Sequence, residues 1–204
     1  MSRTRSRALF VMCIAFLVLF GASIAVSWVQ HRRLLASAVN CRANLSAIAW
    51  GIQCYIEKHG SAPPVVVLGP DGRPWHSWRI LLLESLDRNL FTQYRMTEPW
   101  DGPQNRQLLE AIPQCYQCPN HPRVGTDVFT HYLAVIGKSS VSPHLICSNN
   151  RTMEIVVIET DRFDVPWMCP FDLTQDDIEN GLYRPGSHDP NGPAILLDNL
   201  QILR

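Results

Sequence analysis

The stretch Ala8–Val29, ALFVMCIAFLVLFGASIAVSWV, is the longest apolar run of the 204-residue chain and contains no charged side chain. At 1.5 Å per helical residue, its 22 residues span about 33 Å, which is enough to cross a hydrocarbon core of about 30 Å. Trp28 lies at its end, where interfacial aromatic side chains are enriched. This stretch therefore predicts a transmembrane helix.

Basic residues flank the apolar run on both sides. Three arginines lie in residues 1–7, and His31, Arg32 and Arg33 follow the run. Charge alone therefore sets no orientation, but a long C-terminal part is translocated largely regardless of its charge. We predict a single-pass protein of the cytoplasmic (inner) membrane. Residues 1–7 are cytoplasmic and residues 8–29 cross the membrane.

A cleaved signal peptide is the alternative interpretation of the same run. Ser23 and Ala25 form a small-x-small pattern after the apolar segment, so that a secreted product would begin near Val26.

Apolar residues continue at helical spacing beyond the membrane segment, which disfavours cleavage. They recur at alternating steps of four and three: Leu34, Ala38, Cys41, Leu45, Ile48, Ile52 and Tyr55. Polar residues occupy the other faces: Arg33, Ser37, Asn40, Asn44 and Gln53. The pattern predicts that the helix continues through residues 30–60, which we call the stalk, and ends at His59-Gly60. Two helices joined by a hinge near Gln30–Arg33 fit the pattern as well.

All 15 prolines lie at or beyond Pro63, which separates the stalk from a loop-rich head, residues 61–204. Ser77 is placed to cap a helix over Trp78–Leu86, and Asn105–Ala111 suggests another. Strand candidates are rich in β-branched and aromatic residues: Val65–Leu68, Tyr132–Ile136, Glu154–Glu159, Ala194–Leu197 and Leu200–Leu203.

The last two strand candidates flank Asp198-Asn199, a two-residue link that suits a tight hairpin. We predict an α+β head in which a small antiparallel sheet packs on the C-terminal half of the stalk helix.

The charge balance disfavours a nucleic-acid partner. The chain has 18 basic and 18 acidic side chains, but five arginines and no acid lie in residues 1–33. The remainder is acidic and repels phosphate backbones.

Six of the seven cysteines lie outside the membrane run, and an even number in an oxidising compartment permits disulfides. The exception is Cys13. The segment from Cys115 to His121 contains a CxxC pair, Cys115 and Cys118, which allows a thiol redox pair or part of a zinc site with His121. Structural disulfides or unreactive thiols explain these cysteines better, since prolines bracket the pair and no second metal-binding pair exists.

Two other residue sets permit ligand binding. Tryptophans of the head either line a sugar- or peptide-binding face or belong to the core: Trp75, Trp78, Trp100 and Trp167. Acidic residues close in sequence either hold Ca²⁺ or form a solvated loop: Asp161, Asp164, Asp172, Asp176 and Asp177. The sequence has no nucleophile elbow, HExxH, EF-hand or phosphate-binding loop, so we expect no enzyme, no cofactor and no resident metal.

Several short sequence segments, taken together, resemble those of a known family. They are Cys41–Ile48, His59–Pro64, Asp71–Leu83, Glu98–Asn105, Tyr116–Pro119, Thr130–Gly137 and Val165–Leu173. The chain resembles a large planctomycete family of pseudopilin-like proteins of unknown function, which are similar to the type II secretion major pseudopilin. The resemblance implies a pilin-like fold: a long N-terminal helix, transmembrane in its first half, packed on an α+β head outside the cytoplasm.

Two details qualify this resemblance. Members commonly begin with a prepilin cleavage signal, which this chain lacks, so filament assembly and processing do not follow. Cys41 and Cys118 fall on positions where the family often has cysteine, and the resemblance implies a disulfide between stalk and head.

We expect a non-enzymatic, membrane-anchored envelope protein with a structural or interaction role. Its partners are the lipid bilayer and like subunits, which pack through small residues such as Gly21, Ala22 and Ser23. Two alternatives are a glycan- or peptide-binding module that uses the head tryptophans, and a thiol oxidoreductase centred on Cys115 and Cys118.

Overall fold

A computed structural model describes residues 2–118, 128–136, 155–160, 164–174, 176–177, 180–181, 195–197 and 201–203. The chain divides into two compact units, Met1–Ala38 and Val39–Arg204.

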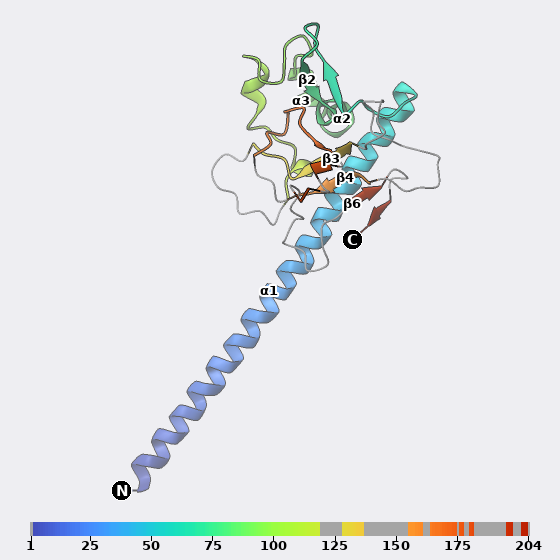
Figure 1. Cartoon of the computed structure of the whole chain (residues 1–204). Helices are drawn as coiled ribbons and strands as arrows, with labels where there is room; N and C mark the ends of the chain where they lie inside the picture. The colour runs from blue at the N-terminus through green and yellow to red at the C-terminus, as the bar shows by residue number, and fades with distance from the viewer. Residues whose placement is uncertain are drawn as a thin grey trace. The chain divides into compact units, whose positions relative to one another are not determined.

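The N-terminal helix α1 covers Ser2–His59 and is helical through Gln30–Arg33, where a hinge was the alternative (Figure 1). Its segment Met12–Arg32 has a mean hydropathy of 2.3, and none of it is buried. Phe16, Leu17 and Leu19 are each between 65% and 70% exposed. The first unit therefore has a helix that is long and apolar enough to cross a membrane.

The helix ends where the sequence predicts. Gly60 has a φ of 75° and donates its backbone N–H to Ile56 O at 2.8 Å. Glycine adopts this left-handed conformation without the steric cost that a Cβ atom brings, so it terminates the helix.

The part of α1 in the second unit packs on the head through the predicted stripe. Cys41, Leu45, Ile48 and Ile52 are buried, and Tyr55 is half-buried. The polar face is less simple than predicted, because Asn44 is half-buried and bonded to the head. The stripe forms part of the main hydrophobic core of this unit.

Helix α2 covers Trp78–Leu86, as predicted, and the Ser77 hydroxyl accepts from Arg79 N at 3.3 Å at its start. Helix α3, Arg88–Gln93, follows directly and is capped by Asp87, whose carboxylate accepts from Leu90 N at 3.0 Å. The helix predicted over Asn105–Ala111 is a shorter 3₁₀ helix, η1, which covers Asn105–Leu108. A second 3₁₀ helix, η2, covers Gln114–Tyr116.

The described part of the head contains two small sheets. Strands β1 and β2 form an antiparallel pair, and five strands form a second sheet in the order β5-β3-β4-β6-β7. Their bounds are Val66–Leu68 (β1), Pro74–Ser77 (β2), Tyr132–Ile136 (β3), Ile155–Glu159 (β4), Leu173–Thr174 (β5), Ile195–Leu197 (β6) and Ile202–Leu203 (β7). In Figure 1 the C-terminal part of α1 lies beside β3, β4 and β6, whose side chains share its core. The α+β layout with a long N-terminal helix is therefore confirmed.

Two details of the sheet differ from the prediction. β5 pairs with β3 in parallel, so the five-stranded sheet is mixed. β6 and β7 are antiparallel, as predicted, but Ile195 lies opposite Leu203. This is one residue away from the pairing with Ile202 that a two-residue link would give. The link, Asp198-Asn199, lies outside the described residues.

Candidate functional site

Two thiols and a carboxylate meet in the interior of the second unit. Cys41 comes from α1, Cys118 from the segment after η2, and Glu159 from the end of β4. The two sulfur atoms lie 3.3 Å apart, and each lies within 4.8 Å of a Glu159 carboxylate oxygen. All three residues are at most 6% exposed. We call these residues the Cys-Cys-Glu cluster.

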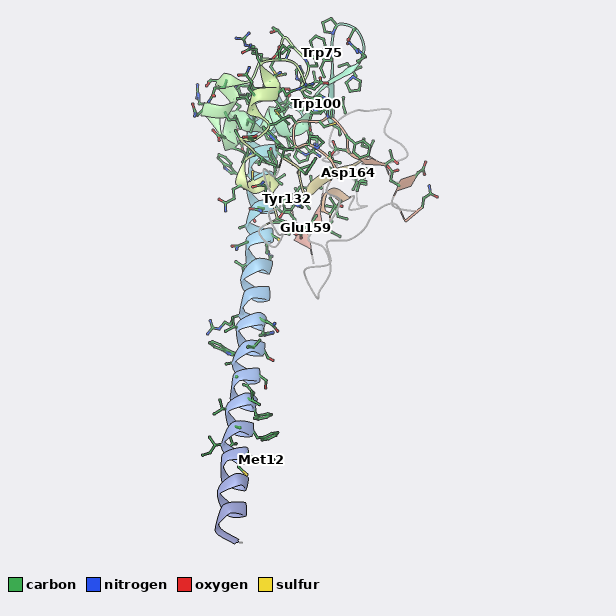
Figure 2. All side chains as sticks on the ribbon, turned by 90° about the vertical axis from the view of Figure 1, so that its left-hand side faces the viewer. Met12, Trp75, Trp100, Tyr132, Glu159 and Asp164 are labelled. Atoms are coloured by element: carbon green, nitrogen blue, oxygen red, sulfur yellow. The ribbon has the colours of Figure 1, made fainter. Side chains whose placement is uncertain are left out.

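Neighbouring residues fix the position of this cluster. Tyr132 lies directly opposite Glu159 in the β3–β4 ladder, so both side chains leave the same face of the sheet (Figure 2). Asn44, one helical turn beyond Cys41, donates to the Tyr132 hydroxyl at 3.3 Å and to Gln117 O at 2.7 Å. These contacts connect α1, the sheet and the segment that carries Cys118.

The imidazole of His131 fixes the backbone at Cys118 through a hydrogen bond. The Cys118 N–H donates to Nδ1 of His131 at 3.0 Å, which requires this nitrogen to be unprotonated. His131 therefore orients the segment that carries the thiol.

The environment keeps the Cys41 thiol protonated. A hydrogen bond with Cys118, burial, and a hydrogen bond with Glu159, in that order, raise the pKa of Cys41 well above its ordinary value. Burial is also the largest cause of the raised pKa of Tyr132. Because thiolate is the reactive form, the Cys41 thiol is unreactive unless a base removes its proton.

The disulfide implied between Cys41 and Cys118 is not present, since a disulfide bond is about 2.05 Å long and both residues are free cysteines. The two residues are nevertheless brought into contact. The zinc set suggested around Cys115 and Cys118 differs from the cluster observed, in which Cys118 meets Cys41 and Glu159. His121 lies outside the described residues.

Cys115 lies elsewhere, against the main hydrophobic core. Burial raises its pKa to about 12. A redox-active CxxC thiol needs a lowered pKa, so this environment disfavours a thiol oxidoreductase at Cys115.

Two of the four predicted aromatic residues are core residues and face no ligand, which corrects that prediction. Trp78 and Trp167 are both 0% exposed. Their indole N–H groups have internal acceptors: the Asp172 carboxylate at 3.1 Å for Trp78 and Leu109 O at 3.0 Å for Trp167.

The other two, Trp75 and Trp100, are half-buried and lie together at one end of the head (Figure 2). The backbone N–H of Trp100 donates to the backbone carbonyl of Trp75 at 3.0 Å. The Trp75 ring covers Gly69, where an added Cβ would lie 2.1 Å from it. Trp75 and Trp100 therefore remain candidates for a ligand-binding surface.

The acidic residues of this set that the structure describes do not come together as one calcium site. Asp172 is buried and accepts hydrogen bonds from Arg79 and from Ala134 N, both at 2.7 Å. Asp177 accepts from Thr174, and Asp161 lies outside the described residues. Asp164 borders an open pocket of about 220 Å³ next to Cys169 and Phe171, which is smaller than the roughly 300–1,000 Å³ of ligand pockets.

A family model described as "Protein of unknown function (DUF1559)" matches residues 30–169, which is more than half of the chain. The chain belongs to the DUF1559 family. No curated protein and no solved structure matches it. The DUF1559 match includes the whole Cys-Cys-Glu cluster and all four predicted tryptophans, whereas the apolar segment Ala8–Val29 precedes it.

The sequence did not identify Glu159, Tyr132, Asn44 or His131 as members of the site. One signal was available, because Glu159 ends a strand that is otherwise apolar from Ile155 to Ile158. A charge that ends a buried strand indicates an internal partner, but not which one.

Proposed function

We propose that this DUF1559 protein is a pseudopilin-like membrane protein, anchored by α1 in the inner membrane with the unit Val39–Arg204 outside the cytoplasm. Its role is structural, through contacts with other envelope proteins. We also propose that it is related to the planctomycete pseudopilin-like proteins and to the type II secretion pseudopilin. The single observation that carries it is the uncovered apolar surface of Met12–Arg32.

Exposed apolar side chains over this length are unfavourable in water, at about 25 cal/mol per Å². A bilayer removes this cost. At the end of the segment, the Arg32 guanidinium lies 4.7 Å from the centre of the Trp28 ring. This pair suits a membrane interface, where an aromatic ring and a basic side chain both anchor helices.

A non-catalytic role is supported by the chemistry of the head. The Cys41 and Cys115 thiols are held protonated, and the pocket beside Asp164 is small. Like subunits are the proposed partners of α1. An added Cβ at Gly21 meets nothing within 4 Å, so this position is open to close approach by another helix.

The test is membrane fractionation of cells that contain the native protein, followed by N-terminal sequencing. We expect the full chain in the pellet after alkaline carbonate extraction, with residues 8–29 intact. Protease added to the outer face of spheroplasts should digest the unit Val39–Arg204. A soluble product that begins near Val26 overturns the proposal in favour of a signal peptide.

The second candidate is an extracytoplasmic glycan- or peptide-binding module. It is favoured by the backbone hydrogen bond between Trp100 and Trp75, which holds these two half-buried residues next to each other. In pull-down on cell-wall glycan and on envelope peptides, the double variant Trp75→Ala, Trp100→Ala should lose binding. Trp50→Ala is the matched control, since Trp50 is 54% exposed on α1 and away from this pair in sequence. Equal binding by both variants excludes this candidate.

A further inference from the structure

We propose that the Cys-Cys-Glu cluster binds a Zn²⁺ ion, which joins α1 to the head. All three ligands belong to the unit Val39–Arg204, so the inference does not depend on the membrane anchor. Sequence motifs did not predict this site, because Cys41 and Cys118 are 77 positions apart and Glu159 lies in a later strand. It differs from the zinc set suggested around Cys115 and His121, with which it shares Cys118.

The donor atoms of the cluster suit zinc. Thiolate sulfur and carboxylate oxygen are both zinc ligands, whereas Ca²⁺ and Mg²⁺ bind oxygen and disfavour sulfur. The three ligand atoms lie within 4.8 Å of one another. Among the described residues, no other group of three His, Cys, Asp or Glu side chains gathers in this way.

Only small movements are needed to form the site. In a tetrahedral site with Zn–S bonds of about 2.3 Å, two sulfur ligands lie about 3.8 Å apart. The sulfur atoms of Cys41 and Cys118 are 3.3 Å apart, so they must separate by about 0.5 Å. A sulfur and an oxygen ligand lie about 3.5 Å apart, so the Glu159 carboxylate must approach by at most about 1.3 Å. Rotation about the side-chain bonds of Glu159 allows this movement.

A divalent ion also supplies the charge that two buried thiolates need. In the described part of the chain, every cause that shifts the pKa of Cys41 raises it: the hydrogen bond with Cys118, burial, and the hydrogen bond and charge of Glu159. Without an ion the Cys41 thiol therefore stays protonated. When zinc binds, two S–H bonds break, two Zn–S bonds form and two protons pass to the solvent.

The Tyr132 hydroxyl is the oxygen atom that the fold offers as a fourth ligand. Tyr132 is 0% exposed and lies directly opposite Glu159 in the β3–β4 ladder. Its oxygen accepts from Asn44 at 3.3 Å, one helical turn beyond Cys41. After burial, charges on Cys41, Glu159 and Cys118 raise the pKa of Tyr132, so its hydroxyl lies near all three. Four protein ligands make a closed site, which is typical of structural zinc.

Binding at this site is coupled to folding. The ligands come from α1, from the segment after η2 and from the end of β4, and only the packed unit brings them together. The ion therefore stabilises the packing of α1 on the head, because it binds the folded unit and not the unfolded chain.

The test measures metal in the full-length protein, expressed without a histidine tag and purified in detergent without chelators. Elemental analysis should find about one zinc per chain. Cys41→Ser and Glu159→Gln should each weaken zinc binding by about tenfold or more. Cys54→Ser is the matched control, since Cys54 is half-buried on the same helix, and it should leave zinc binding unchanged.

Cys115→Ser distinguishes this cluster from the CxxC set. It should keep its zinc, because Cys115 lies against the main hydrophobic core and is not a ligand here. Zinc that is lost in Cys115→Ser but retained in Cys41→Ser overturns the inference in favour of the CxxC set. Zinc that is retained in all these variants is bound elsewhere and overturns it as well.

A second measurement needs only the native chain, in case a variant fails to fold. Removing zinc with a chelator under reducing conditions should lower the thermal unfolding midpoint, and added Zn²⁺, but not Ca²⁺, should restore it. Co²⁺ in place of zinc should give sulfur-to-cobalt charge-transfer absorption in the near ultraviolet. A midpoint that ignores chelator and Zn²⁺, or bound Co²⁺ without this absorption, overturns the inference.

A disulfide at the same pair is the competing outcome, since it uses both sulfur atoms. Alkylation of thiols at lysis, followed by non-reducing peptide mapping, detects it. A link between Cys41 and Cys118 in the native protein, or native protein without zinc, overturns the inference. Neither result affects the membrane anchor, which fractionation tests separately.

Discussion

The guanidinium of Arg79 and the carboxylate of Asp172 form an ion pair with 2.7 Å between Nη2 and Oδ1, and both side chains are 0% exposed. Arg79 also donates to Ser77 Oγ and Tyr132 O, at 2.6 Å and 3.2 Å. Asp172 accepts from Trp78 and Ala134 as well. The pair therefore joins the start of α2 to β3 and to the segment before β5.

We predict that Asp172→Asn destabilises the second unit by about 3–5 kcal/mol, because it leaves the buried guanidinium without a countercharge. Urea unfolding in detergent, followed by tryptophan fluorescence, measures the loss. Asp71→Asn is the matched control, since Asp71 also pairs with an arginine, Arg73 at 2.6 Å, but on the surface. Asp71→Asn should hardly change the midpoint of urea unfolding. Equal losses of stability in both variants would show that burial of the ion pair does not increase its contribution.

His76 should make stability depend on pH. His76 is 2% exposed, with 2.8 Å between Nδ1 and the Tyr94 hydroxyl, and burial lowers its pKa below the ordinary 6.5. The unfolded chain therefore binds a proton that the folded chain does not. The stabilisation is complete above about pH 6.5 and is lost as the pH falls through the folded pKa.

Replacing this ring should flatten that dependence. In His76→Asn, which keeps a hydrogen-bonding group near the position of Nδ1, the unfolding midpoint should change less between pH 7 and pH 5 than it does in the native chain. The comparison removes contributions that the other histidines make to both proteins. Parallel curves for the two proteins would show that His76 is not responsible.

The role of Gly60 in ending α1 can be tested by substitution. Gly60→Ala should destabilise the second unit by about 1 kcal/mol, because a Cβ atom disfavours the φ of 75° at this position. Gly60→Asn should cost less, since asparagine tolerates left-handed backbone better than alanine does. Thermal unfolding in detergent ranks the three chains, and an alanine variant as stable as the native one would contradict the assigned role.

Local sequence patterns correctly predicted the features of the fold that depend on residues close together in the chain. The stripe from Cys41 to Tyr55, the cap at Ser77 and the end of α1 at Gly60 were all correct, because periodicity and capping act over a few residues. β2 was missed, since it starts with a proline and becomes a strand by pairing with β1. β5 has two residues, too few for a period to show.

Contacts between residues far apart in the chain were harder to predict from the sequence. Arg79 lies in an apolar helix, which signals a buried partner, but Asp172 is 93 positions away and was assigned to a possible calcium site. The contact between Cys41 and Cys118 was expected from family resemblance alone. Spacing in the chain contains no information about either pair, because the packing of α1 and α2 on the sheet creates both.

The apolar surface of α1 provides the last prediction. Leu17 is 65% exposed and lies near the middle of the predicted membrane segment Ala8–Val29. An arginine at the centre of a membrane helix costs about 2.5–3.5 kcal/mol in insertion. Leu17→Arg should therefore reduce the share of the protein that resists carbonate extraction, as measured by immunoblotting of membrane and soluble fractions. Val39→Arg is the matched control, because Val39 is 68% exposed on the same helix but outside that segment. It should leave the membrane share unchanged; an equal loss in both variants would mean that added charge, and not its position in the bilayer, releases the protein.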